Sequence, residues 1–204
     1  MRSKVSAVAA EWLAREGVVK QEERSLFAYA MNSLFFGIAP VIIAAALGFL
    51  FGMLPQSLWM VAPFMLVRKF SGGFHLASPV VCIFTSTVLL ACALGAVYCV
   101  LQAGQTVLLT CITALSTLCL WCCSPIDSAA RRLSEKERML FRRIARILTA
   151  ILFATYGVLT GFRLNAVAVP LGVGLCIAAL LQVPCLLSRP GHKQNDHSHR
   201  KNVV

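Results

Sequence analysis

Charged side chains, and acidic ones above all, are scarce in this chain. Only 13% of its residues are charged, and 8 Asp and Glu stand against 19 Lys and Arg. Soluble domains have about 25% charged residues. A chain of 204 residues that is 58% hydrophobic cannot hide its apolar surface in one water-soluble core. A soluble domain is therefore excluded, and lipid is the expected solvent.

The N-terminal region lacks the uninterrupted apolar core of a secretory signal. Residues 1–33 carry five basic and four acidic side chains. Val5, Trp12 and Leu26 belong to an apolar series with near-helical spacing. The series predicts an amphipathic helix, which lies either on the membrane surface or against the rest of the protein.

Cysteines placed in polar loops, as in a disulfide framework, are also lacking. Eight of the nine cysteines lie inside apolar runs and the ninth, Cys123, ends one, so most are interpreted as small apolar residues. Cys119 and Cys122 have redox-motif spacing, which leaves a thiol–disulfide oxidoreductase as an alternative. We expect no cofactor and no metal, and we interpret His192, His197 and His199 as part of a solvated tail.

Long apolar segments dominate what is present. Six can be drawn, at about 34–52, 53–69, 79–101, 105–123, 144–162 and 165–187. They predict an all-α polytopic membrane protein with about six transmembrane segments. The second is interrupted by Pro55 and Pro63, so it is either a kinked span or half of a re-entrant hairpin. The predicted organisation is an amphipathic segment at 1–33, a membrane domain at 34–187 and a basic, disordered tail at 188–204.

The basic residues predict the orientation. Six crossings place eighteen of the 19 Lys and Arg residues on one side and leave Arg163 on the other. Because positive charge marks the cytoplasmic face, both termini are predicted to be cytoplasmic. The charge also suits anionic lipid. Nothing around the basic residues resembles a nucleic-acid-binding fold, so nucleic acid is not an expected partner.

One polar stretch between two apolar runs is the candidate site. It contains Arg68, Gly72, Gly73, His75, Ser78 and Cys82. Ser78 and Pro79 form a good helix start, which places Cys82 near the positive end of a helix dipole. Such a place favours the thiolate, and a thiolate with a nearby histidine base is a nucleophile.

The spacing of His75 and Cys82 requires a bend. Seven residues along a straight helix would separate them by about 10.5 Å of rise. A base must approach its nucleophile to about 3 Å. The chain must therefore turn between them, which Gly73 and Pro79 permit.

The basic segment that follows residue 123 has two interpretations. It begins Ser124-Pro-Ile-Asp127, and Ser134 with Glu137 forms a capping box for a helix entering the fifth apolar segment. It is either a cytoplasmic linker and helix start, or a basic surface for an acidic peptide. The basic candidates for that surface are Arg131, Arg132, Arg138, Arg142 and Arg143. Asp127 either orients His75 or stabilises a turn.

The pattern Arg68…Gly73-Phe-His75…Cys82, with Ser124-Pro-Ile-Asp127 and a basic segment after it, resembles the accessory gene regulator B family. These are bacterial membrane cysteine endopeptidases of peptide quorum sensing. The resemblance implies Cys82 as nucleophile, His75 as base, Arg68 and Gly73 as supporting residues, an AgrD-like propeptide as substrate and a homodimer. It further implies cleavage after the peptide core and cyclisation to a thiolactone or lactone.

An alternative of another class is a small membrane transporter or peptide exporter. It predicts polar residues spread through several spans at mid-depth. The apolar segments here carry almost no charge, which disfavours ion transport.

Overall fold

The computed structural model describes residues 24–71, 79–124 and 135–183, and within them it is entirely helical. Helix α2 spans Arg24–Leu50, α3 Leu54–Ser71 and α4 Pro79–Ala103. Helix α5 spans Thr106–Cys123, α6 Glu135–Gly161 and α7 Asn165–Leu180. The prediction of an all-α protein is confirmed.

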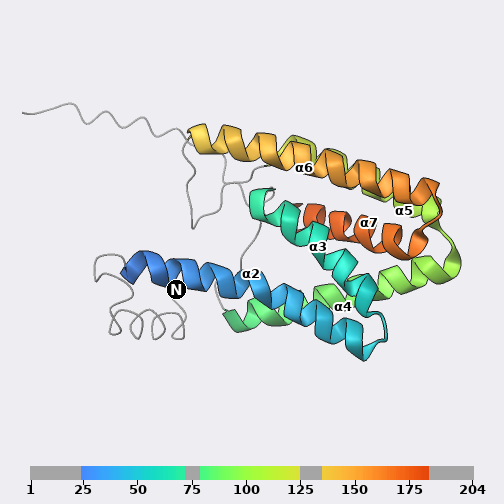
Figure 1. Cartoon of the computed structure of the whole chain (residues 1–204), viewed down its shortest axis with the longest axis horizontal. Helices are drawn as coiled ribbons and strands as arrows, with labels where there is room; N and C mark the ends of the chain where they lie inside the picture. Colours follow the sequence, from blue (N-terminus) through green and yellow to red (C-terminus); the bar gives the residue numbers. More distant parts are fainter. Residues whose placement is uncertain (1–23, 72–78, 125–134, 184–204) are drawn as a thin grey trace, which may run out of the picture.

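Successive helices run in opposite directions, so the bundle has two ends (Figure 1). The site end holds the end of α3, the start of α4, the end of α5, the start of α6 and the end of α7. The turn end holds the short connections after α2, α4 and α6. Each of these turns has one residue with positive φ, namely Gly52 (66°), Gly104 (65°) and Arg163 (58°). Glycine adopts such a conformation without steric cost, whereas Arg163 does not.

Helix α7 forms the centre of the bundle. It packs against α3, α4, α5 and α6, and eleven of its 16 residues are buried. Two glycines allow this close packing. A Cβ on Gly174 would overlap the backbone oxygen of Met60 on α3, and a Cβ on Gly172 would lie 2.7 Å from the Tyr156 ring on α6. Small residues at helix contacts are the usual means of close packing in lipid.

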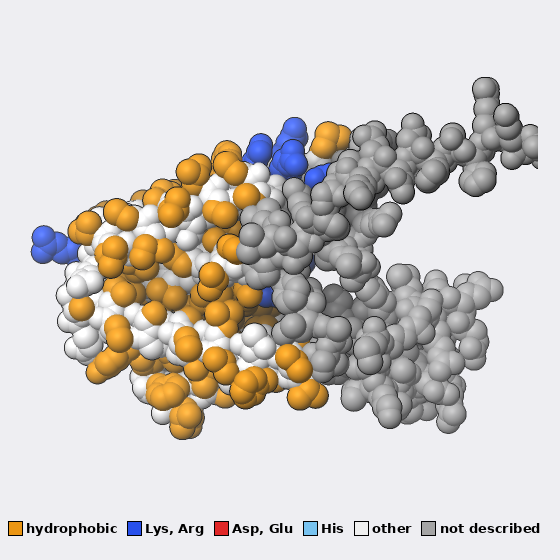
Figure 2. Space-filling view, turned by 180° about the vertical axis from the view of Figure 1, so that it is seen from behind, with side chains coloured by type: hydrophobic (Ala, Val, Ile, Leu, Met, Phe, Trp, Pro, Cys, Tyr) orange, Lys and Arg blue, Asp and Glu red, His pale blue; other side chains and the backbone are white. Residues whose placement is uncertain are grey.

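The outer helices expose apolar side chains instead. Helices α4, α5 and α6 contain segments long and apolar enough to cross a membrane, while 37–50 and 165–180 are apolar but shorter. Hydrophobic side chains cover most of the described surface in Figure 2. Phe84, Val107 and Leu115 are each about 70% exposed or more, as lipid-facing residues would be. An integral membrane protein follows from these surfaces.

The predicted segments correspond to the six helices, with three differences in extent. Helix α7 ends at Leu180, whereas the predicted segment runs to 187. Helix α2 begins at Arg24, ten residues before the apolar segment drawn from 34. Helix α6 begins at Glu135 rather than at 144, and the predicted cap Ser134 lies outside the described residues. Helix α3 continues through Pro63 as one helix and runs from the turn end to the site end, which favours the kinked span over the re-entrant hairpin (Figure 1).

Candidate active site at the end of α3 and the start of α4

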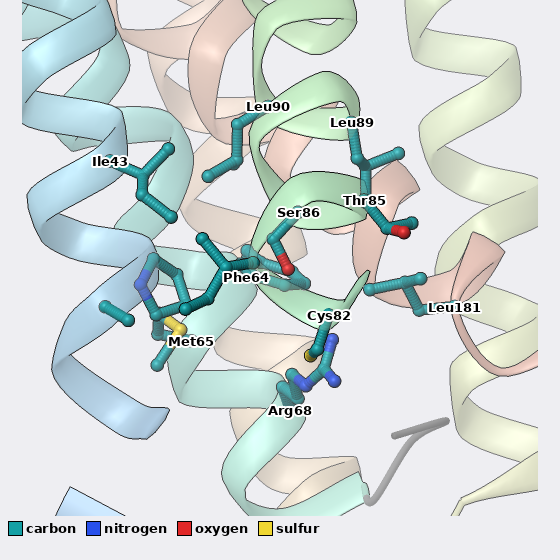
Figure 3. Close-up of a pocket in the computed structure, with 13 residues that line it drawn as sticks. Ile43, Phe64, Met65, Arg68, Cys82, Thr85, Ser86, Leu89, Leu90 and Leu181 are labelled. Atoms are coloured by element: carbon teal, nitrogen blue, oxygen red, sulfur yellow. The ribbon is translucent and has the colours of Figure 1, made fainter. Parts of the chain in front are cut away.

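A pocket of about 90 Å³ opens near the site end, between α2, α3 and α4. Most of its lining is apolar, with Pro40 and Ile43 from α2 and Phe64 and Met65 from α3 among the contributors. Leu181, one residue after α7, closes one wall. The polar lining comes from Arg68, Cys82, Thr85 and Ser86, which Figure 3 shows together with these apolar walls.

Cys82 is the fourth residue of α4, so it lies in the first turn of a helix. Its side chain is half-buried and is not in a disulfide. The first four N–H groups of a helix have no intrahelical acceptor, and they make this end of the dipole positive. The Cys82 thiol therefore lines the pocket from the N-terminal end of α4.

Arg68 lies in the last turn of α3 and faces the same pocket. Its guanidinium stands 5.6 Å from the centroid of the Phe64 ring, which also lines the pocket. Stacking on an aromatic face fixes the direction of the cation. Arg68 and Cys82, fourteen positions apart in sequence, are thus brought to one site by the antiparallel arrangement of α3 and α4 (Figure 3).

Several predicted site residues lie outside the described part of the chain. These are Gly72, Gly73, His75, Ser78, Asp127, Arg131 and Arg132, together with residues 1–23 of the N-terminal segment and the C-terminal tail. Helices α3 and α4, which flank these residues, run in opposite directions (Figure 1), while the bend between His75 and Cys82 itself stays a prediction.

Carboxylates are scarce in the described helices. Residues 24–71, 79–124 and 138–183 contain neither Asp nor Glu, and among the described residues only Glu135 and Glu137, in the first turn of α6, carry a carboxylate. The role of Asp127 in orienting His75 remains a prediction.

The basic start of α6 lies at the same end as the pocket. The Phe70 ring near the end of α3 is 6.2 Å from the Phe141 ring on α6. Arg142 and Arg143 follow directly and are exposed, and basic side chains gather at this end in Figure 2. Further along, Arg146 donates to the Trp121 backbone oxygen over 3.3 Å.

The cysteine pair at 119 and 122 lies on α5, away from the residues that line the pocket. Cys119 is half-buried, Cys122 is exposed, and both thiols are free. Among the described residues, no cluster of His, Cys, Asp and Glu could hold a metal ion.

Sequence reasoning missed Ser86 and Leu181 as pocket residues. Ser86 follows Cys82 by four positions, a spacing that places both on one helix face. That signal was available in the sequence. Leu181 has no such signal, because its place in the pocket depends on how α7 packs.

These features define a helical integral membrane protein with a cysteine at a helix N-terminus, set in a pocket with an arginine. Residues 6–185 match the model of the family described as Accessory gene regulator B, and the chain belongs to that family. It therefore takes part in processing the peptide of an accessory gene regulator quorum-sensing system. No curated protein and no solved structure matches the chain.

Proposed function

We propose that the protein is a membrane cysteine endopeptidase that cleaves an AgrD-like propeptide at the C-terminal side of its core and promotes cyclisation. The carrying observation is that Cys82, in the first turn of α4, lines one pocket with Arg68 in a chain of this family. The substrate is a short cytoplasmic precursor, as the family resemblance implies.

In the first half-reaction, His75 takes the proton of the Cys82 thiol, and the sulfur attacks the scissile carbonyl carbon. The C=O π pair moves to oxygen as the C–S bond forms. When this intermediate collapses, the C–N bond breaks and the leaving amine takes the proton from His75. The product is an acyl-Cys82 thioester, with the C-terminal part of the propeptide released.

In the second half-reaction, the thiol of the peptide core attacks the same carbon. A new C–S bond forms, the bond to Cys82 breaks, and the proton passes through His75 back to Cys82. One thioester replaces another, so the step is nearly balanced in free energy. A serine in the core would give a lactone by the same route.

Water is the competitor in this second step, because hydrolysis of the thioester is irreversible. The pocket is lined mainly by apolar residues, and a closed apolar site is one means of keeping water out. Holding the core thiol beside the acyl carbon also raises its effective concentration. Both effects favour cyclisation over hydrolysis.

Charge supports the substrate assignment and the orientation. The exposed Arg142 and Arg143 lie at the site end, where an acidic propeptide tail would be attracted. We place this end, with both termini, in the cytoplasm of a bacterial cell membrane, because the described turns at the other end contain only one basic residue, Arg163. The family resemblance further leads us to propose a homodimer.

The test uses the full-length protein in liposomes with a synthetic propeptide taken from the gene beside its own. Mass spectrometry should show cleavage and a cyclic product with wild type and with C119S, and neither with Cys82→Ala. Full activity of Cys82→Ala would overturn the assignment of the nucleophile. Cleavage that depends on Cys119 rather than Cys82 would assign the nucleophile to Cys119. Absence of cleavage together with thiol–disulfide exchange that depends on Cys119 would identify a thiol–disulfide oxidoreductase.

A further inference from the structure

Ser86 lies one helical turn after Cys82 on α4 and lines the same pocket. Side chains four residues apart on a helix have Cβ atoms about 5–6 Å from each other. Helical side chains also lean toward the N-terminus of their helix. In Figure 3 the Ser86 hydroxyl oxygen is directed toward Cys82 and Arg68, whereas the Thr85 hydroxyl points another way.

The fold makes no use of this hydroxyl. Thr87, one position further, donates to the backbone oxygen of Ile83 at 2.9 Å. The same bond to the preceding turn is made by Thr110, Thr117, Thr149, Thr155 and Thr160. Within the part of the chain that the structure describes, Ser86 makes neither this bond nor another side-chain hydrogen bond. The Ser86 side chain is half-buried and lines the pocket, so its hydroxyl is available to donate to an atom of a bound ligand.

We propose that Ser86 is a further catalytic residue, whose hydroxyl donates a hydrogen bond to the oxyanion formed when Cys82 attacks the scissile carbonyl. The inference rests on the proposed peptidase function. An oxygen on the attacked carbon lies about 3 Å from the sulfur, and a hydrogen bond adds about 2.8 Å. The sulfur-to-oxygen distance and the hydrogen-bond length together are close to the separation of side chains one helical turn apart, such as those of Cys82 and Ser86.

The Ser86 hydroxyl keeps its own proton throughout. The C=O π pair moves to oxygen on attack and returns when the C–N bond breaks, while Ser86 only donates a hydrogen bond. The same oxyanion forms again when the core thiol attacks acyl-Cys82, so Ser86 acts in both half-reactions. Arg68 lines the same pocket and is an additional donor. The first N–H groups of α4 have no intrahelical acceptor and lie at the same end of that helix as Cys82.

The experiment compares wild type, Ser86→Ala, Thr87→Val and Cys82→Ala, each as full-length protein in liposomes with the synthetic propeptide. Thr87→Val is the matched control, because it removes a hydroxyl that the helix itself uses. Ser86→Ala should lower kcat for cleavage about 100-fold with KM little changed, as expected for a donor that acts only in the transition state. Thr87→Val should stay within about threefold of wild type.

The outcomes separate the two proposals. Cleavage by Cys82→Ala would overturn the peptidase proposal and this one with it. An inactive Cys82→Ala with a Ser86→Ala that matches Thr87→Val would overturn the role of Ser86 alone, as would a change in KM without a change in kcat. Propeptide binding by Ser86→Ala is measured beside kcat to show that the pocket is intact. If Ser86→Ala is not recovered as a folded protein, Ser86→Gly, which removes the same hydroxyl, is measured instead.

Discussion

Two regions of the bundle differ in whether their hydroxyl groups have hydrogen-bond partners. One is the interior between α5, α6 and α7, and the other is the pocket between α2, α3 and α4. In the first, Thr110 meets the Tyr156 hydroxyl at 2.9 Å, and Thr113 meets the Cys176 sulfur at 3.7 Å. In the second, the Ser86 hydroxyl has no partner among the described residues. Both regions lie in the same bundle, so the two kinds of hydroxyl can be compared within one protein.

The comparison shows how to separate structural from functional polar groups in a membrane protein. Paired hydroxyls between helices hold the helices together and leave nothing for a substrate. A hydroxyl that faces a cavity without a protein partner is available to a ligand. The predictions below test this division.

The largest effect is expected at the contact between α7 and α3. Gly174→Leu would drive a side chain into the Met60 backbone and Pro63, so the variant should not be recovered as a folded protein. Gly157→Leu is the control, because nothing lies within 4 Å of a Cβ there. Size-exclusion profiles in detergent would check both, and a folded Gly174→Leu would contradict the central place of α7.

The next largest effect is expected at Arg68. Arg68→Ala removes the one cation among the described residues that line the pocket, and cleavage should fall about 100-fold. Arg68→Lys keeps the charge but loses the planar guanidinium, so it should recover only part of the rate. Lys69→Ala is the neighbouring control, since Lys69 does not line the pocket. Equal rates for the Arg68 and Lys69 variants would remove Arg68 from the site.

Charge reversal at the start of α6 should have a smaller effect, and on binding rather than chemistry. The double variant Arg142→Glu with Arg143→Glu should raise KM for an acidic-tailed propeptide about tenfold and leave kcat unchanged. The effect should shrink as salt is raised, because both side chains are exposed. An unchanged KM at low salt would show that the substrate does not use this surface.

The smallest effect is expected where polar groups are paired. Thr110→Val breaks the bond to Tyr156, which should lower the free energy of unfolding by about 0.6 kcal/mol, the average for such bonds in membranes. Cleavage per folded molecule should not change. Unfolding in mixed detergent and kinetics in liposomes would measure the two quantities. A lower kcat for Thr110→Val would show that a paired hydroxyl between helices also serves the reaction.

The sequence predicted the helices well because lipid leaves few choices. An apolar run of sufficient length has to satisfy its backbone internally, and the ends of α3, α4 and α5 fall close to the predicted boundaries. It could not predict which helix is central. Helix α7 is apolar like its neighbours, and its burial depends on how Gly172 and Gly174 meet Tyr156 and Met60.

For the site, the motif placed Cys82 in the first turn of a helix, and the structure has it there. It also named Arg68, which lines the same pocket. The pairing of Cys82 with His75 stays a prediction, since His75 lies outside the described residues. Leu181 could not be foreseen, because a residue more than ninety positions from Cys82 enters the pocket only through tertiary packing.

The place of Leu181 has a consequence for the newly made chain. The pocket begins with α2 and gains Arg68 and Cys82 with α3 and α4, yet the wall made by Leu181 arrives only after the last helix has been synthesised. A chain still on the ribosome after α6 holds its thiol in an unfinished, more open cavity. The order of synthesis thus postpones a complete pocket until the whole bundle is assembled.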